Sequence, residues 1–146
     1  MKVLVACEFS GIVREAFARL GHEAWSCDLL ETEIPSARHH VGDAVAFLNS
    51  TKWDLVVAHP PCTYLCNSGV RWLFGGKGKV RDEARFALMY QAADFFAEFM
   101  FSDAPSVCIE NPIMHKYAAD YLNSSYNLDR ELKQIAEICR WLARHP

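Results

Sequence analysis

The feature that most constrains the fold is an alternation of short apolar runs with amphipathic segments of helical period. Residues 2–7 and 54–58 are rich in valine and have the character of strands buried on both faces of a sheet. Two further runs, residues 22–27 and 106–110, also predict strands. Segments with an apolar helical face separate these runs, at residues 12–20, 44–49 and 81–101. The alternation is typical of βαβ units, so we predict an α/β fold with a mostly parallel sheet and helices on both faces.

Turn and capping residues divide the chain further. Ser10 and Asp43 precede predicted helices and are the expected N-caps. Residues 29–40 have the composition of a loop. The glycines in residues 67–79 predict a segment that is flexible or takes its shape from a bound ligand. A last helix is predicted at residues 129–144. With no internal repeat or linker, residues 1–146 are expected to form one domain.

Length and composition exclude several classes of protein. A chain of 146 residues with 51% apolar and 23% charged residues has enough material for a core and is not intrinsically disordered. No apolar stretch approaches the roughly 20 residues needed to span a bilayer. The N-terminal apolar run is too short for a secretory signal, and the six cysteines form no C-x-x-C pair. We therefore expect a cytoplasmic protein with reduced thiols and no membrane partner.

Charge is distributed unevenly along the chain. The net charge is −3, which provides no general attraction to a polyanion. Residues 64–90 nevertheless carry five basic groups against two acidic ones, and they are the candidates for phosphate contact: Arg71, Lys77, Lys79, Arg81 and Arg85. The alternative is an ordinary solvated surface.

Polar residues follow each predicted strand, where a parallel sheet binds its ligands. Glu8, Asp28 and Glu110 stand at such positions, together with the segments 42–43 and 59–62. We expect them to line one edge of the sheet. Taken singly, each of them is equally typical of a turn or a helix cap.

Asp28 lies at the end of the second strand, about 20 residues after the first turn, where a carboxylate can bind the hydroxyls of a ribose. The alternative is an aspartate that caps a turn. The sequence has no G-x-G-x-x-G segment, which disfavours a dinucleotide cofactor.

Cys62 follows two prolines at the end of a strand, so its thiol is held on a stiff loop and is a candidate nucleophile. We expect it to be alkylated more readily than the strand cysteines Cys7, Cys27 and Cys108, which should lie inside. An inert buried cysteine is one alternative. Zinc bound by Cys62 and Cys66 with a histidine is another, disfavoured because a second ligand pair is missing.

Glu110 closes the last predicted strand, before Asn111-Pro112. A carboxyl group beside an apolar strand can have a raised pKa and donate a hydrogen bond. The alternative is a solvated carboxylate next to an Asn-Pro turn.

Five segments in this order resemble the C5-cytosine DNA methyltransferases, in particular the compact forms of phages and prophages. The matching segments cover roughly residues 1–120 and are Cys7-Glu8-Phe9-Ser10-Gly11, Asp28, Gly42-Asp43, Pro60-Pro61-Cys62 and Glu110-Asn111-Pro112. Pro-Pro-Cys alone is a weak signal, whereas five ordered matches are fairly specific.

The resemblance implies a Rossmann-like S-adenosylmethionine-dependent methyltransferase fold. It implies that S-adenosylmethionine is bound by Phe9, Ser10, Gly11, Asp28, Asp43 and Pro60. It further implies that Cys62 adds to carbon 6 of cytosine while Glu110 binds N3 and the exocyclic amine, and that DNA is the substrate.

The sequence departs from this family at several points. Cys7 stands where the family usually has an aspartate, and the family's Gln-x-Arg-x-Arg motif and target-recognition region have no counterpart. Residues 121–146 are expected to be a helix outside the resemblance. Three alternatives therefore stay open: an amino-group (N4 or N6) methyltransferase, a non-catalytic regulator that binds S-adenosylmethionine or a protein, and an enzyme acting on free cytosine nucleotides. DNA recognition through single strands or a partner subunit is also consistent with these departures.

Overall fold

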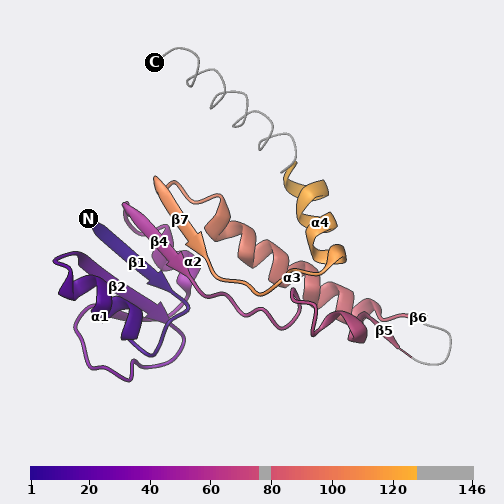
Figure 1. Ribbon diagram of the computed structural model, residues 1–146, viewed down its shortest axis with the longest axis horizontal. Helices are drawn as coiled ribbons and strands as arrows, with labels where there is room; N and C mark the ends of the chain where they lie inside the picture. Colours follow the sequence, from indigo (N-terminus) through magenta and orange to yellow (C-terminus); the bar gives the residue numbers. More distant parts are fainter. Residues whose placement is uncertain (76–79, 128–146) are drawn as a thin grey trace, which may run out of the picture.

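The computed structural model describes residues 1–75 and 80–127, and it contains a five-stranded sheet that is wholly parallel (Figure 1). The strand order is β3-β2-β1-β4-β7. The strands are β1 (Lys2–Ala6), β2 (Glu23–Asp28), β3 (His39–Val41), β4 (Leu55–Ala58) and β7 (Ser106–Ile109). The predicted α/β class with a mostly parallel sheet is confirmed, and the arrangement is compatible with a Rossmann-like fold.

Helices cover both faces of this sheet because neighbouring strand residues point to opposite sides. The α1 helix (Ile12–Arg19) packs on the face that contains Val3 and Val5. The α2 helix (Ala44–Leu48) and the C-terminal half of α3 (Glu83–Met100) pack on the other face, against Leu4 and Val56. The prediction of helices on both faces is confirmed.

A second hydrophobic core lies beyond the carboxyl ends of the strands. It is formed by one face of α3 from Phe86 to Ala97, the 3-10 turn Val70–Leu73, Phe74 of β5 (Phe74–Gly75), α4 (Lys116–Tyr126) and Leu65. The strand β5 pairs with β6 (Val80–Arg81) in a hairpin. Figure 1 shows α3 running from the sheet to this hairpin. The α4 helix is tied to α3 because Asp94 accepts hydrogen bonds from the hydroxyls of Tyr121 and Tyr126, each at 2.9 Å. The α3 helix therefore belongs to both cores.

Three elements differ from the sequence-based expectations. The strand β3 begins in the predicted loop 29–40, and the predicted flexible segment 67–79 contains β5, whose partner strand β6 directly follows it. The predicted helix at 121–146 begins earlier, as α4, which ends at Tyr126 before Asn127 takes a left-handed φ of 54°. The predicted helix 129–144, Lys77 and Lys79 lie outside the described residues.

Ser10 is not the N-cap of α1. That position belongs to Gly11, whose φ is 76°, and the free N–H groups of Val13 and Arg14 are instead bound by the Glu8 carboxylate at 2.7 and 3.4 Å. The Ser10 hydroxyl donates to the same carboxylate at 3.1 Å and accepts from the Ile12 N–H at 3.3 Å, so it binds the first N–H of α1 from the position before the N-cap. The expected cap at Asp43 is confirmed, because its side chain accepts from the Ala46 N–H at 2.8 Å.

The expectation that Cys108 lies inside is wrong. The strand β7 is the last strand of the sheet, paired only with β4 among the described residues, and the Cys108 side chain on it is exposed. The described part of the chain contains no helix that is both long and apolar enough to cross a membrane.

Candidate functional site

A pocket of about 180 Å³ opens at the carboxyl ends of the strands, next to β1. The chain passes from β1 to β2 and β3 on one side, then to β4 and β7 on the other, so β1 and β4 flank the point where the strand order reverses. Open α/β sheets bind ligands at this point. The pocket is lined by Cys7, Asp28, Leu29, Gly42, Asp43, Ala44, Pro61 and Phe95. The structure therefore gathers residues that follow four strands into one site.

Asp28 and Asp43 bring two carboxylates to this pocket, and each also has a structural role. One oxygen of Asp28 accepts from the Leu30 N–H at 3.1 Å, which closes a turn, and Asp43 caps α2. Within residues 1–75 and 80–127 the second oxygen of each carboxylate accepts no hydrogen bond. The capping role and a ligand-binding role are thus compatible for both residues.

The Cys7 side chain lines the pocket as a neutral thiol. Burial, followed by the nearby Asp28 carboxylate, raises the pKa of the Cys7 thiol to about 12. Its backbone has a φ of 58°, a left-handed conformation that side chains other than those of asparagine, aspartate and glycine seldom adopt. Cys7 is therefore a neutral thiol on a constrained turn.

The Glu8 carboxylate occupies the position at the N-terminus of α1 where another anion would bind. Glu8 is 6% exposed, and the free N–H groups that it binds would otherwise bind a phosphate. This arrangement gives a physical reason, additional to the missing glycine motif, to disfavour a dinucleotide. The residues predicted to contact the cofactor beside it, Phe9, Ser10 and Gly11, do not line the pocket.

Arg14 is a residue that the sequence analysis missed. Although it is 1% exposed, its guanidinium donates to the Ser26 hydroxyl at 2.9 Å and to the Ile34 carbonyl at 2.8 Å. Ser26 continues the network to His39 Nδ1 at 2.8 Å, and His39 Nε2 bonds the Leu30 carbonyl at 2.9 Å. The network fixes the loop that follows Asp28. Nothing in the pattern around residue 14 distinguishes a buried arginine from an exposed one.

Cys62 lies on the loop after β4, which is joined to the loop after β7. The backbone of Asn67 bonds the Ile113 carbonyl at 3.1 Å, and the backbone of His115 bonds the Leu65 carbonyl at 2.9 Å. The buried ring of His115 adds a third link, from Nε2 to the Tyr64 carbonyl at 2.9 Å, while its Nδ1 caps α4. These bonds hold the Cys62 loop against the segment that begins with Glu110.

The charge of Glu110 has a small effect on the Cys62 thiol. The pKa of the half-buried Cys62 thiol is raised, chiefly by burial, then by Cys66 and to a lesser degree by the Glu110 carboxylate. Pro61, the neighbour of Cys62, lines the pocket, whereas the predicted cofactor contact Pro60 is buried and does not. The stiff Pro-Pro segment thus places the candidate nucleophile directly beside the pocket.

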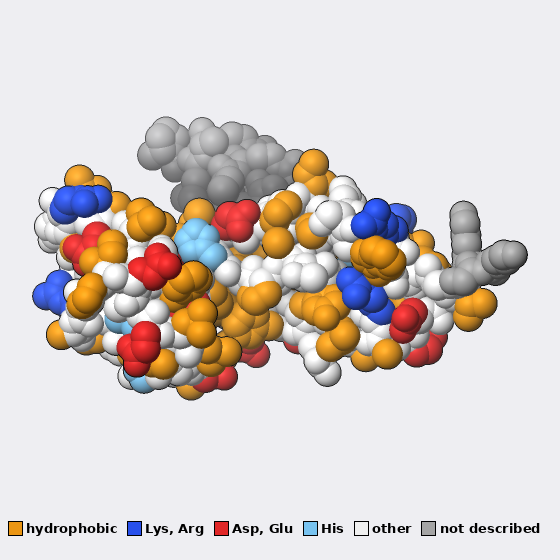
Figure 2. Space-filling model, turned by 90° about the horizontal axis from the view of Figure 1, so that it is seen from below, with side chains coloured by type: hydrophobic (Ala, Val, Ile, Leu, Met, Phe, Trp, Pro, Cys, Tyr) orange, Lys and Arg blue, Asp and Glu red, His pale blue; other side chains and the backbone are white. Residues whose placement is uncertain are grey.

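Three of the five predicted phosphate contacts gather on a surface with aromatic side chains. We call this the basic-aromatic surface; it comprises Tyr64, Arg71, Trp72, Arg81 and Arg85. The guanidinium of Arg71 lies 4.6 Å from the Trp72 ring, and that of Arg85 lies 4.9 Å from the Tyr64 ring. Figure 2 shows basic and hydrophobic side chains together at the end of the molecule where the β5–β6 hairpin lies. Because Tyr64 belongs to the Cys62 loop, this surface adjoins the candidate nucleophile.

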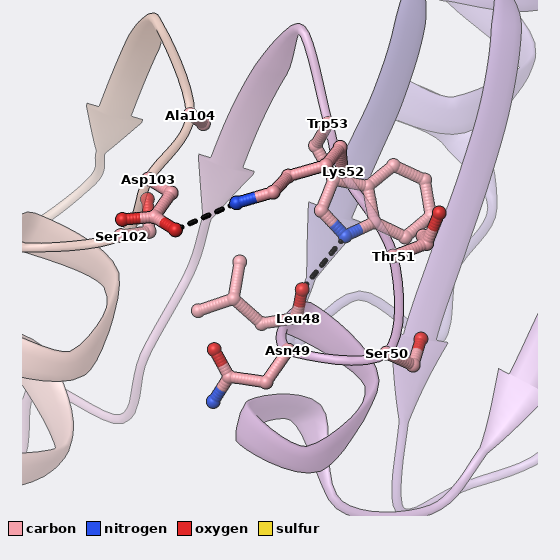
Figure 3. A pocket seen from close by; sticks show the side chains of 9 residues that line it. All are labelled: Leu48, Asn49, Ser50, Thr51, Lys52, Trp53, Ser102, Asp103 and Ala104. Atoms are coloured by element: carbon pink, nitrogen blue, oxygen red, sulfur yellow. Dashed lines mark hydrogen bonds and ion pairs between the residues drawn. The ribbon is translucent and has the colours of Figure 1, made fainter.

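A second pocket, of about 290 Å³, lies at the opposite end of the sheet, where the loops before β4 and β7 meet (Figure 3). Lys52 and Asp103 form an exposed ion pair of 2.7 Å across it, and Trp53 Nε1 donates to the Leu48 carbonyl at 3.0 Å. It is remote from the strand ends that carry the predicted site residues. Among the described residues, no three histidine, cysteine or acidic side chains come together as a metal site.

We expect Cys108 to be alkylated before Cys62, the reverse of the order predicted from the sequence. Cys108 is exposed, whereas Cys62 is half-buried and its thiol has a raised pKa. Cys7 and Cys27 should react more slowly still, because burial raises their pKa values to about 12 and 11. Brief iodoacetamide treatment followed by peptide mapping measures this order. Faster labelling of Cys62 than of Cys108 would contradict it.

Comparisons of the chain with family models, curated proteins and solved structures gave no match.

Proposed function

We propose that this domain is an S-adenosylmethionine-dependent methyltransferase that acts on carbon 5 of cytosine in DNA. One observation supports it most: a pocket containing Asp28 lies at the reversal point of a parallel sheet, directly beside the Cys62 loop, and backbone hydrogen bonds tie this loop to the segment that begins with Glu110. The arrangement combines a place for a nucleoside with an adjacent thiol. A Rossmann-like methyltransferase fold is consistent with the strand order.

The pocket fits the nucleoside part of S-adenosylmethionine. Asp28 and Asp43 each have one carboxylate oxygen available for hydroxyl or amino groups, and Leu29, Pro61 and Phe95 supply apolar surface. A volume of about 180 Å³ suits part of such a molecule. Because Glu8 occupies the N-terminus of α1, the site favours a ligand without phosphates. When bound, this cofactor supplies an electrophilic methyl group on a sulfonium.

Cys62 and Glu110 have distinct roles in the proposed reaction. Carbon 5 of cytosine is too weak a nucleophile to accept a methyl group unaided, and addition of the Cys62 sulfur at carbon 6 makes it enamine-like. Glu110 hydrogen-bonds N3 and the exocyclic amine and stabilises the charge that develops in the ring. Because the pKa of Cys62 is raised, the thiol proton passes to solvent as the sulfur adds. Removal of the carbon-5 proton by a base then breaks the carbon 6–sulfur bond, which restores the aromatic ring and releases Cys62.

The basic-aromatic surface is the proposed DNA contact. Arginines bind phosphates, and exposed Trp72 offers a ring on which a base can stack. Three described arginines in a chain of net charge −3 give only a few phosphate contacts. We therefore propose single-stranded or mismatched cytosine as the substrate that the domain handles best on its own, because flipping out such a base costs least.

One observation favours a second candidate function. The raised pKa of Cys62 makes it a poor nucleophile at neutral pH in the absence of substrate. The same pocket would then serve a non-catalytic regulator that binds S-adenosylmethionine. Binding of this compound without methyl transfer to any cytosine substrate distinguishes the regulator from the enzyme.

Replacing Asp28 with alanine should weaken binding of S-adenosylmethionine by roughly 10- to 150-fold, about 1.5–3 kcal/mol, because charged hydrogen bonds to the ribose are lost. Calorimetric titration with S-adenosylmethionine and its demethylated product measures the change. Asp103→Ala is the matched control, since it removes an exposed carboxylate at the other end of the sheet. No binding to the unmodified chain would reject the proposed cofactor, and equal binding by folded Asp28→Ala would reject the role of Asp28.

A further inference from the structure

Cys66 is a nucleophilic group that the proposed reaction does not use, and it lies behind Cys62 on the same turn. The carbonyl of Cys62 accepts hydrogen bonds from the backbone of Leu65 at 2.9 Å and of Cys66 at 3.0 Å. An i to i+4 bond of this kind places the two Cα atoms about 6 Å apart. This separation lies within the range of roughly 4.4–6.8 Å that disulfides require.

The two sulfurs also influence each other's protonation: after burial, the neighbouring Cys66 is the next largest cause of the raised pKa of the Cys62 thiol. Cys66 is 6% exposed and lies 2.9 Å from the Ser68 hydroxyl, while Cys62 is half-buried and is the more accessible of the two sulfurs. An accessible thiol with a buried thiol one backbone turn away is an arrangement in which the second sulfur can resolve an oxidised first one.

The two sulfurs differ in proton affinity: the pKa of Cys62 is raised, so Cys62 gives up its proton only as it reacts, whereas Cys66 is the sulfur more readily available as a thiolate. The pKa of Cys66 is lowered, chiefly by the Ser68 hydroxyl and then by the backbone N–H groups of Gly69 and Ser68. A sulfur stabilised as the thiolate is the attacking species in disulfide formation.

We propose that Cys62 and Cys66 are a peroxide-sensitive pair that closes to an intramolecular disulfide. The Cys62 sulfur attacks hydrogen peroxide and gives up its proton, the O–O bond breaks, and the products are a sulfenic acid and water. The Cys66 thiolate then attacks the sulfenic sulfur, the S–O bond breaks, and the departing hydroxide takes up a proton to become a second water. In sum, two thiols and one peroxide give a disulfide and two waters. Where the proposed function holds, this oxidation removes the nucleophile reversibly.

The test is peroxide treatment of the full reduced chain, followed by tryptic mapping. Cleavage after Lys52 and Arg71 releases one peptide, residues 53–71, that carries both cysteines and no other. We expect this peptide to lose two hydrogens and its reactivity toward iodoacetamide, and to regain both after reduction. Cleavage by chymotrypsin after Tyr64 should then give two fragments that separate only when reduced.

Two variants distinguish this pair from general oxidation. In Cys66→Ser the disulfide peptide should disappear, and a sulfenic acid trapped by dimedone should accumulate on Cys62. The matched control, Cys108→Ser, removes an exposed cysteine and should leave formation of the disulfide unchanged. Oxidation of the native Cys62 to sulfinic acid, or an unoxidised 53–71 peptide after Cys108 has reacted, would overturn the proposal. Peptide mapping needs neither S-adenosylmethionine nor DNA. Its outcome therefore tests the disulfide independently of methyl transfer.

Discussion

Replacing Cys62 with alanine is expected to lower methyl transfer to cytosine by about 10³-fold or more, because no other group would make carbon 5 nucleophilic. Binding of S-adenosylmethionine should change little, since Pro61 rather than Cys62 lines the pocket. Transfer of a tritiated methyl group to single-stranded DNA, compared with duplex DNA at two salt concentrations, measures the effect. The native activity should be higher on single strands and should fall steeply with added salt.

Cys108→Ala is the matched control for this experiment, because it removes an exposed thiol on the neighbouring strand β7. It should retain native activity. Transfer that survives in Cys62→Ala would instead assign the domain to the amino-group methyltransferases. Rapid, salt-resistant methylation of duplex DNA by the native chain would show that its DNA contacts extend well beyond the basic-aromatic surface.

Replacing Arg14 with leucine should lower the free energy of unfolding by about 2–4 kcal/mol. The change removes the guanidinium donor from the buried Ser26 hydroxyl, the half-buried Thr32 hydroxyl and the Ile34 carbonyl. This is a large part of the roughly 5–15 kcal/mol that stabilises a typical domain. Urea denaturation followed by circular dichroism measures the difference.

The matched control is Arg19→Leu, because Arg19 is an exposed arginine on the same helix, in its last turn. It should shift the free energy of unfolding by no more than about 0.5 kcal/mol. An Arg14→Leu midpoint equal to that of the control would show that the loop after Asp28 does not depend on the buried guanidinium.

Strands with a strong apolar pattern were predictable from the sequence, whereas elements formed mainly by tertiary contacts were not. Valine-rich runs such as β1 and β4 bury both faces and therefore have a composition that identifies them. In contrast, β3 has only three residues, two of them histidines, and it forms because it pairs with β2 through Ser26, Cys27 and Asp28. Local propensity contains no signal for such a strand.

The site was predictable in its position more than in its details. The rule that ligands bind beyond parallel strands identified Asp28, Asp43 and the Cys62 loop, and all three contribute to or adjoin the pocket. The role of Glu8 was missed, because a capping side chain usually comes from the residue next to the helix rather than from three residues earlier. The exposure of Cys108 was missed because it depends on β7 lying at the edge of the sheet.

The position of α3 in both hydrophobic cores has a consequence for how the protein loses its structure. Phe99 of this helix is buried against the sheet, and Phe86 is buried in the core beneath the hairpin. Fraying of either end of the helix withdraws apolar contacts from the core at that end, and the continuous backbone of α3 connects the two. We therefore expect the two cores to unfold as one cooperative unit. The Cys62 loop contributes Leu65 to the second core, so it loses this support when α3 unfolds at either end.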